Sequence, residues 1–304
     1  MADILIHEVG LRDGLQVEKA VVPTDVKLGW ARRLIASGVD LIQLGSFVHR
    51  DKVPQMADTE EIFAAFREAG GRPVLTGLVL NEKGLERGLA CGVRYFCMGV
   101  SASETHSRKN TGMGIDEATS RILRMAQAAR SAGAGVQVSV QSAFGCGFEG
   151  LVPEARVLGI VTTFLDAGLR TISLADTAGH ATPDRVERLF SGIHCLDPTV
   201  ECACHFHDTY GLGLVNCHAA LRAGVKYFEA AFAGLGGCPF TAVTGGNVCT
   251  EDLVHLFHRM GQRQDIDLEP LIDVARQAAA FFARELPGRI HRTGPIPHPT
   301  PMPA

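Results

Sequence analysis

One short pattern recurs five times along the chain and limits its possible folds more than any other sequence feature. In each copy, a segment of helical period ends in a small residue and a glycine, and an apolar run follows at once. Glycine suits this junction because it adopts the left-handed conformation that ends a helix before the chain reverses into a strand. The copies are ASGVDLIQLG around Gly38, ACGVRYFCMG around Gly92, SAGAGVQVSV around Gly135, DAGLRTISLA around Gly168 and RAGVKYFEAA around Gly224.

Three more apolar runs bring the number of predicted strands to eight. These runs are Ile4–Val9, Val74–Leu80 and Val200–His207, and the segments of helical period between strands include Val26–Ser37, Asp58–Ala69 and Leu212–Gly224. Eight strand–helix units in 304 residues predict a closed (β/α)₈ barrel, the TIM barrel of the α/β class. Two separate open α/β domains are the alternative that the pattern leaves open.

The C-terminal part of the chain has a different composition. A further helix is expected near Leu268–Leu286, and six of the 18 residues in 287–304 are proline. We therefore expect a barrel domain over residues 1–286 and a proline-rich tail over 287–304 that lies outside the barrel.

Composition and charge exclude several classes of protein. With 46% apolar and 20% charged residues, the chain can bury a full core without disulfides. A net charge of −4 and the lack of a Lys/Arg run argue against nucleic acid as a partner. No apolar run reaches the roughly 18 residues of a membrane span, and the N-terminus does not read as a signal peptide. Nine cysteines, most of them in apolar runs, fit a reducing compartment, so we expect a cytoplasmic protein.

Polar residues gather where the predicted strands end, which is the edge at which TIM barrels carry their chemistry. In chain order they are Arg12, Asp13 and Gln16 in GLRDGLQ, Gln43 and Ser46, Gln137, Ser139 and Gln141, Asp176 and Thr177, His205, His207 and Asp208, and Cys238. We take this edge as the candidate active site.

Two histidines in this set have the spacing of metal ligands. His205 and His207 lie two residues apart in an extended run, so both imidazoles point to the same face of the sheet. Together with Asp13 they predict a site for a divalent Lewis-acid ion, and Mg²⁺, Mn²⁺, Zn²⁺ and Fe²⁺ all suit these ligands. A structural zinc cluster that adds Cys202 and Cys204 is the alternative. Strand geometry disfavours it, because those cysteines face the other side of the strand.

Cys238 lies in the glycine-rich loop GLGGCP at the predicted barrel mouth, where packing does not explain a thiol. Such a thiol can exchange protons or attack an electrophile, and an incidental cysteine in a tight turn is the alternative. Asn247, in TGGNVCTED, would by itself be taken for a residue flanking a helix N-cap.

Together, these segments resemble the 3-hydroxy-3-methylglutaryl-CoA lyases, members of the metal-dependent DRE-TIM lyase superfamily. The resemblance runs from about residue 3 to residue 285 and rests on VGLRDGLQVEK, SFVHRDKVPQMAD, AFGCGFEG, SLADTAG, HFHDTYG and AGLGGCPFTAVTGGN. It implies a TIM barrel and a Mg²⁺ or Mn²⁺ ion bound by Asp13, His205, His207 and Asn247.

The resemblance also implies a reaction, the retro-Claisen cleavage of a 3-hydroxyacyl-CoA into acetyl-CoA and a keto acid. Arg12 is the expected cation for the acetyl-CoA enolate, and Cys238 is the expected proton donor to its carbon. The base that takes the hydroxyl proton is expected to be Asp176 or His207.

Three inward-facing positions depart from the family pattern. Gln43 stands where the lyases usually have Glu, while Gln137 and Ser139 align with the usual Arg and Tyr. The first change removes a carboxylate that would orient Arg12, and the last removes most of an aromatic side chain beside the substrate. With Gln16, these are the expected substrate-binding residues. They point to a related substrate, such as citramalyl-CoA or a 3-hydroxy-3-alkylglutaryl-CoA.

Other functions remain as alternatives at this stage. A Claisen-type synthase and a hydroxy-keto-acid aldolase belong to the same superfamily, but the synthases usually show HxHND, and neither group carries GLGGCP. A catalytically silent binding protein is disfavoured because the expected catalytic set is intact. No P-loop or dinucleotide fingerprint appears, so Lys19, Lys52 and Arg108 are only candidates for the CoA phosphates. The expected assembly is a homodimer.

Overall fold

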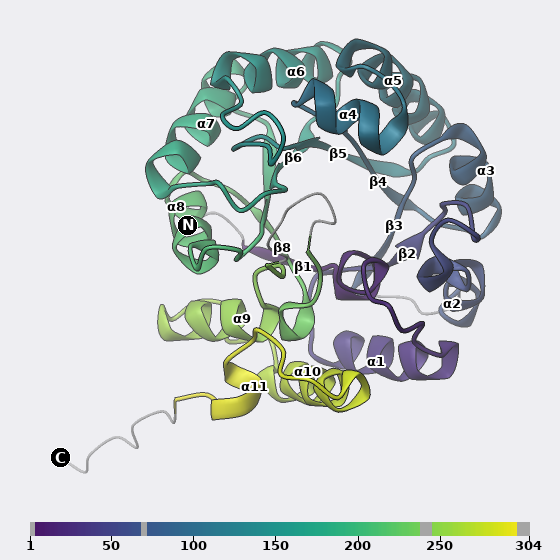
Figure 1. Ribbon diagram of the computed structural model, residues 1–304, viewed down its shortest axis with the longest axis vertical. Coiled ribbons are helices and arrows are strands. Elements are labelled where there is room, and N and C mark those ends of the chain that lie inside the picture. Colours follow the sequence, from purple (N-terminus) through teal and green to yellow (C-terminus); the bar gives the residue numbers. More distant parts are fainter. Residues whose placement is uncertain (1–3, 68–71, 238–244, 297–304) are drawn as a thin grey trace.

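Eight parallel strands close into a barrel in the computed structural model, which describes residues 4–67, 72–237 and 245–296 (Figure 1). The strands are β1 (Leu5–Glu8), β2 (Leu41–Ser46), β3 (Val74–Leu78), β4 (Tyr95–Ser101), β5 (Gly135–Gln141), β6 (Thr171–Asp176), β7 (Glu201–Phe206) and β8 (Tyr227–Ala230). Pairing of β1 with β8, from Leu5 opposite Tyr227 to Glu8 opposite Ala230, closes the barrel. The predicted TIM barrel is confirmed, and the alternative of two open α/β domains is wrong.

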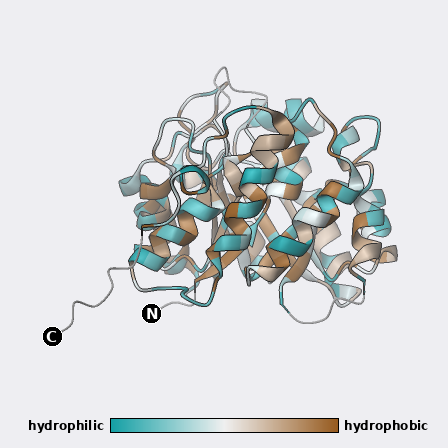
Figure 2. Ribbon diagram, turned by 90° about the horizontal axis from the view of Figure 1, so that it is seen from below, coloured by the Kyte–Doolittle hydropathy of each residue, from teal (hydrophilic) through white to brown (hydrophobic). Residues whose placement is uncertain are grey.

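Helices surround the barrel. They are α1 (Thr24–Ala36), α2 (Thr59–Ala65), α3 (Glu82–Ala90), α4 (Glu104–Thr111), α5 (Ile115–Ser131), α6 (Glu154–Asp166), α7 (Pro183–Leu196), α8 (Gly213–Arg222), α9 (Thr250–Arg259), α10 (Leu268–Phe282) and α11 (Ile290–Thr293). Three short turns, η1 (Gly10–Gly14), η2 (Pro54–Met56) and η3 (Phe232–Gly234), complete the elements. Apolar and polar residues alternate along the helices because one side of each packs on the barrel (Figure 2).

The glycines of the recurring pattern end helices as expected. Gly38, Gly92, Gly168 and Gly224 have φ angles from 76° to 85°, in the left-handed region. In the third copy, the left-handed residue is Gly133, with φ of 77°, whereas Gly135 is the first residue of β5. The junction there comes two residues earlier than the sequence suggested.

The C-terminal helices pack beside the seam between β8 and β1. The expected extra helix is α10, which contacts α1, α9 and α11 (Figure 1). It ends at Phe282, before the predicted Leu286, because Ala283 takes a left-handed φ of 47°. Part of the expected tail packs against this region, since Gly288 donates its N–H to Ala233 O. Residues 297–304 lie outside the described residues, so the boundary at residue 287 stays a prediction.

The inside of the barrel is unusually polar, although branched apolar side chains fill most TIM barrels. His7 Nε2 lies 2.9 Å from Thr76 Oγ1, and Gln137 and Ser173 donate hydrogen bonds to Glu229. Aromatic side chains pack elsewhere in the core, as in the pairs Phe144–Phe206 and Phe228–Phe257. Of the helices in the described part of the chain, none is both long and apolar enough to cross a membrane.

Candidate active site

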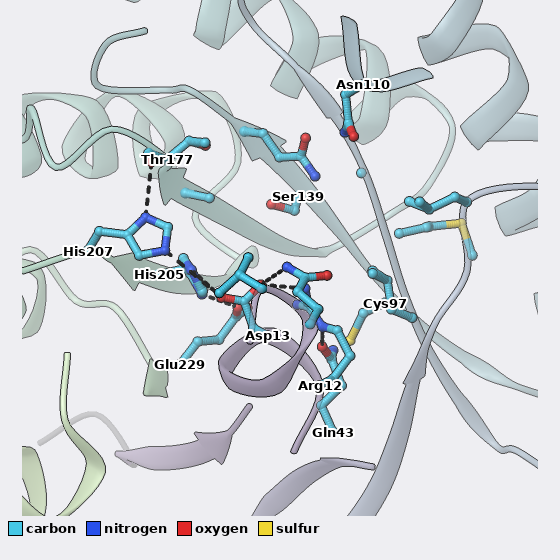
Figure 3. A pocket seen from close by; sticks show the side chains of 18 of the residues that line it. Arg12, Asp13, Gln43, Cys97, Asn110, Ser139, Thr177, His205, His207 and Glu229 are labelled. Carbon is cyan, nitrogen blue, oxygen red and sulfur yellow. Dashed lines mark hydrogen bonds and ion pairs between the residues drawn. The ribbon is translucent and has the colours of Figure 1, made fainter. Parts of the chain in front are cut away.

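A cavity of about 320 Å³ opens where the strands end at the barrel mouth (Figure 3). Ten of the residues singled out from the sequence line it: Arg12, Asp13, Gln16, Gln43, Gln137, Ser139, Gln141, Thr177, His205 and His207. Segments from opposite ends of the chain therefore meet in one hollow. Asp176 and Asn247 do not line the cavity, and Cys238 lies outside the described residues.

Arg12 and Asp13 lie in η1, a single π-helical turn directly after β1. Its N–H groups converge on one carbonyl, because Arg12 and Asp13 both donate to Val9 O. Gly10 is required here, since a Cβ at this position would lie 2.5 Å from a ring carbon of Phe232. The tight turn brings the Arg12 guanidinium against the carboxylate of its neighbour, Asp13.

The Arg12 guanidinium is held from two sides. Its Nη1 donates to Asp13 Oδ1 and its Nε donates to Gln43 Oε1 at the inner face of β2. Gln16 Nε2 donates to the same Asp13 oxygen over 2.9 Å. Gln43 therefore orients Arg12 through a neutral carbonyl oxygen, a weaker acceptor than a carboxylate would be.

His205 and His207 point toward Asp13 from β7 and from the residue after it (Figure 3). Their Nε2 atoms lie 3.8 and 3.9 Å from Asp13 Oδ2, so one carboxylate and two imidazoles form a compact group that could hold a metal ion. Cys202 and Cys204 are buried and do not belong to this group. The zinc-cluster alternative is not formed among the described residues.

Orphaned polar atoms support the fit of this group to a cation. His207 Nδ1 lies 3.0 and 3.1 Å from the carbonyl oxygens of Asp176 and Thr177, which can only accept, so its proton is on Nδ1. The Nε2 lone pair then faces Asp13 with no hydrogen-bond partner. Asn247 donates its Nδ2 to Asp13 Oδ2 over 2.9 Å, and its buried Oδ1 also lacks a partner. A divalent cation suits this donor set.

The electrostatics of the group favour an ionised carboxylate. Burial by itself would raise the pKa of Asp13. The positive charge of Arg12, together with the two histidines, instead keeps this pKa well below its ordinary value. Burial would also lower the pKa of His205, yet the hydrogen bond to Glu229 and the negative charge of Asp13 raise it. Asp13 is thus negative whenever the protein is folded at neutral pH.

Asp176 ends β6 but turns its carboxylate away from the cavity. Its oxygens accept the backbone N–H groups of His180, over 2.8 Å, and Ala181, over 2.9 Å. The side chain is fully buried, and burial raises its pKa. Through its backbone carbonyl, the same residue orients His207.

The remaining two expected substrate residues, Gln137 and Ser139, both line the cavity but differ in their protein contacts. Gln137 donates its Nε2 to Glu229, so this amide is committed to a protein partner. Ser139 lies opposite Gly99 in the pairing of β5 with β4, and both residues line the cavity. A wall made of a serine and a glycine leaves space beside the substrate.

Sequence reasoning missed two cavity residues of chemical interest. Glu229, near the end of β8, is buried and bonded to His205. Cys97, on β4, is a neutral thiol there because burial raises its pKa to about 12. A signal for Glu229 was present, since it is an acid within the otherwise apolar run YFEAAF and occupies an inward position.

Comparison with known proteins places the chain in a family. The HMGL-like family model matches residues 3–277. The chain belongs to the HMGL-like family. This finding confirms the resemblance to the 3-hydroxy-3-methylglutaryl-CoA lyases, and the HMGL-like chain is a carbon–carbon lyase.

Relatives of the HMGL-like chain cover nearly its whole length. It is 34% identical over 287 residues to the hydroxymethylglutaryl-CoA lyase YngG of Bacillus subtilis, with 94% of this chain and 95% of the relative covered. It is 36% identical over 305 residues to the (R)-citramalyl-CoA lyase of Chloroflexus aurantiacus, with 97% and 96% covered. A solved HMG-CoA lyase of Acinetobacter baumannii, in complex with coenzyme A and 3-methylmalate, matches with a TM-score of 0.90 and 35% identity, covering 99% of this chain and 98% of that one.

Proposed function

We propose that this HMGL-like lyase cleaves a 3-hydroxyacyl-CoA by a retro-Claisen reaction into acetyl-CoA and a keto acid. The observation that carries the proposal is the meeting, in one cavity, of the Arg12 guanidinium with the metal-binding group Asp13, His205 and His207. The reaction needs both parts. The substrate hydroxyl must lose its proton, and the thioester oxygen must accept negative charge.

Arg12 would stabilise the enolate. When the C2–C3 bond breaks, its electron pair moves into the thioester to form the acetyl-CoA enolate, and the C3 hydroxyl becomes the carbonyl of the keto acid. A cation fixed in place beforehand stabilises the enolate oxygen without rearranging. Gln43 and Asp13 hold Nε and Nη1 of Arg12, which leaves its Nη2 group for the thioester oxygen.

Asp13, His205, His207 and Asn247 would hold one divalent ion. Carboxylate, amide and imidazole ligands suit several divalent ions, of which we propose Mg²⁺ or Mn²⁺, and Asn247 offers the Oδ1 that lacks a partner. When bound, the ion lowers the pKa of the substrate hydroxyl.

His207 fits a ligand role better than a role as general base. Its Nδ1 is committed to two backbone carbonyls, so Nε2 is its one basic atom. That atom cannot bind an ion and accept a proton at the same time. Asp176, the second candidate base, has both carboxylate oxygens on backbone N–H groups and would act by orienting His207.

Cys238 would protonate the enolate carbon. The neighbouring residue in the chain, Gly237, lines the cavity, which supports an active-site role for the thiol. The carbon of the enolate then becomes the methyl group of acetyl-CoA. The C3 hydroxyl gives up one proton and the enolate carbon gains one, so the reaction balances once the hydroxyl proton restores the Cys238 thiol.

A relative of 3-hydroxy-3-methylglutaryl-CoA that differs at C3 is the substrate we propose. Among the described residues that line the cavity, Arg12 is the only lysine or arginine. A distal carboxylate would thus compete with the enolate for one guanidinium. Citramalyl-CoA, whose carboxylate is attached at C3 beside the hydroxyl, avoids this competition, and a bulkier, less acidic C3 group would use the space beside Ser139 and Gly99.

A substrate screen tests the proposal. Purified protein with Mn²⁺ or Mg²⁺ is offered 3-hydroxy-3-methylglutaryl-CoA, citramalyl-CoA and 3-hydroxy-3-alkylglutaryl-CoAs, and acetyl-CoA and keto acid are quantified. We expect equimolar products and a higher kcat/KM for an analogue than for 3-hydroxy-3-methylglutaryl-CoA, with Asp13→Asn as the inactive control. Failure of the metal-loaded protein to release acetyl-CoA from any of them would overturn the proposed function.

The cellular setting follows as part of the same proposal. We expect a homodimer in the cytoplasm, tested by light scattering and by fractionation. Lys19, Lys52 and Arg108 have exposed side chains and could meet the CoA phosphates, although Arg108 is paired with Glu104 at 2.6 Å.

A further inference from the structure

Glu229 is the second acidic side chain among the described residues that line the cavity, and the mechanism above has no use for it. It is 8% exposed and lies near the end of β8, on the strand next to the one that carries His205. It does not belong to the group of Asp13, His205 and His207 that could hold an ion. A buried carboxylate is costly unless hydrogen bonds compensate it, so its partners indicate what it does there.

Three side chains from three other strands meet at this carboxylate. Gln137 Nε2 from β5 and Ser173 Oγ from β6 donate to Oε1, the latter over 3.1 Å. His205 Nδ1 from β7 lies 3.0 Å from Oε2. The amide group of Gln137 can only donate through Nε2, so Oε1 acts as an acceptor. Glu229 therefore presents its other oxygen, Oε2, to the imidazole of His205.

This arrangement determines which nitrogen of His205 carries the proton. With Gln137 and Ser173 both on Oε1, the carboxylate offers Oε2 as an acceptor, so Nδ1 of His205 is the donor. In the neutral ring, Nε2 then has a lone pair, and this atom faces Asp13 at 3.8 Å. A carboxylate behind a ligating histidine fixes the tautomer and ring orientation and makes the ring a better ligand.

His207 reaches the same protonation pattern by another route. Its Nδ1 is held by the backbone carbonyls of Asp176 and Thr177, which no side-chain substitution removes directly. His205 depends on a side chain for the same purpose. Both imidazoles thus carry their proton on Nδ1. Of the groups that accept these protons, only Glu229 is a side chain, so a point mutation can delete it.

We propose that Glu229 is the positioning residue for His205: it holds the Nδ1–H tautomer and the ring orientation, and so strengthens the binding of the divalent ion. The inference rests on the metal site of the proposed function. Glu229 itself contacts neither substrate nor ion in this role, and it acts through His205 alone.

The test measures Mn²⁺ affinity of the metal-free protein without substrate, by electron paramagnetic resonance of the unbound ion. We expect Glu229→Ala to weaken Mn²⁺ binding by about 10- to 100-fold, the usual effect of removing such a partner. Glu229→Gln keeps an acceptor for Nδ1–H but loses the charge, so its affinity should fall between that of the alanine variant and the wild type.

Thr76→Val is the matched control. It deletes another buried polar contact inside the barrel, the one to His7, while leaving His205 untouched, so its Mn²⁺ affinity should equal that of the wild type. Thermal unfolding of each metal-free variant reports damage to the fold separately. Because Glu229→Gln is nearly isosteric, it carries the test even where the alanine variant does not fold.

The outcomes separate this inference from the proposed function. Wild-type Mn²⁺ affinity in folded Glu229→Gln and Glu229→Ala would overturn the role of Glu229, whatever the catalytic activity. A weakening of equal size in Thr76→Val would also overturn it, because the effect would then be general to the barrel interior. A third outcome is that the wild type binds Mn²⁺ and the Glu229 variants bind it more weakly, but the wild type cleaves no acyl-CoA. That result would support the inference and refute the proposed function.

Discussion

Arg12 is the residue whose chemistry is hardest to replace. Its planar guanidinium contacts Gln43 and Asp13 at once and can still meet a substrate oxygen, whereas an ammonium group lacks this fork of donors. We expect Arg12→Lys to lower kcat by roughly 100- to 1,000-fold, the size seen when a preorganised donor to an oxyanion is lost. Acetyl-CoA release measures the effect, and Mn²⁺ affinity close to the wild type would show that the metal site survives. An unchanged kcat would remove Arg12 from the reaction.

Cys238 is the residue that the sequence singles out most sharply within the loop. We expect Cys238→Ala to fold normally and lose most turnover, with the loss in kcat because a proton donor acts in the transition state. Steady-state kinetics measure this, with Cys195→Ala on the exposed side of α7 as the control. Full activity of Cys238→Ala would show that another group protonates the enolate.

At the residue scale, the sequence predicted which side chains meet at the site better than it predicted the hydrogen bonds between them. The spacing of His205 and His207 and the place of Asp13 after β1 were enough to expect the three side chains together, and the structure does bring them together. Which atoms bond to which was not predictable. Asp176 ends a predicted strand, as a catalytic acid would, yet its carboxylate accepts hydrogen bonds from two backbone N–H groups of the following loop. Glu229 was missed because its three partners come from β5, β6 and β7, far apart in the sequence.

At the scale of elements, a buried contact between His291 and Glu251 links α11 to α9. His291 Nδ1 lies 3.1 Å from Glu251 Oε1 at the start of α9, and the other oxygen of Glu251 accepts the Ala233 N–H from η3. Glu251 is fully buried, so loss of His291 leaves a carboxylate oxygen without its partner. We expect His291→Ala to cost about 1–3 kcal/mol of unfolding free energy.

Chemical denaturation measures this cost. Thr293→Ala, an exposed change on the same short helix, is the control and should leave the unfolding free energy unchanged. Equal stabilities of His291→Ala and the wild type would mean that α11 does not support the barrel.

Element types were predictable wherever local chemistry decides them. Glycines that end helices and apolar runs after them are local signals, and each predicted strand is present with its ends shifted by a few residues at most. The π-turn η1 was not predictable in this way. Its shape depends on the packing of Phe232 against Gly10, and Phe232 follows β8, which is next to β1 in the barrel but far from it in the sequence.

At the scale of the whole molecule, Glu8 should make stability depend on pH. Burial raises its pKa to about 8 in the folded protein, despite hydrogen bonds from Gly10, Phe232 and Thr250. The folded state therefore holds this proton more tightly than the unfolded state does. The stability gained in this way is complete below the ordinary glutamate pKa and is lost as pH rises through about 8.

Glu8→Gln isolates this contribution because glutamine does not titrate. We expect the unfolding free energy of the wild type to fall relative to that of the variant between about pH 5 and about pH 9, measured by urea denaturation. A difference between the two proteins that stays constant over this range would contradict the raised pKa of Glu8.

Metal binding should stabilise the whole barrel against unfolding, because the residues that would bind the ion are spread over almost the entire chain. Asp13 follows β1, the histidines belong to the end of β7, and Asn247 precedes α9, so one ion would link both sides of the strand pairing that closes the barrel. An ion that binds only the folded state adds about 2.7 kcal/mol at 100 times its Kd. In a chain of this size we expect a Tm higher by several degrees in Mn²⁺ than in chelator. Asp13→Ala should abolish the shift. Identical melting of the wild type with ion and with chelator would show that the convergent ligands do not bind an ion in solution.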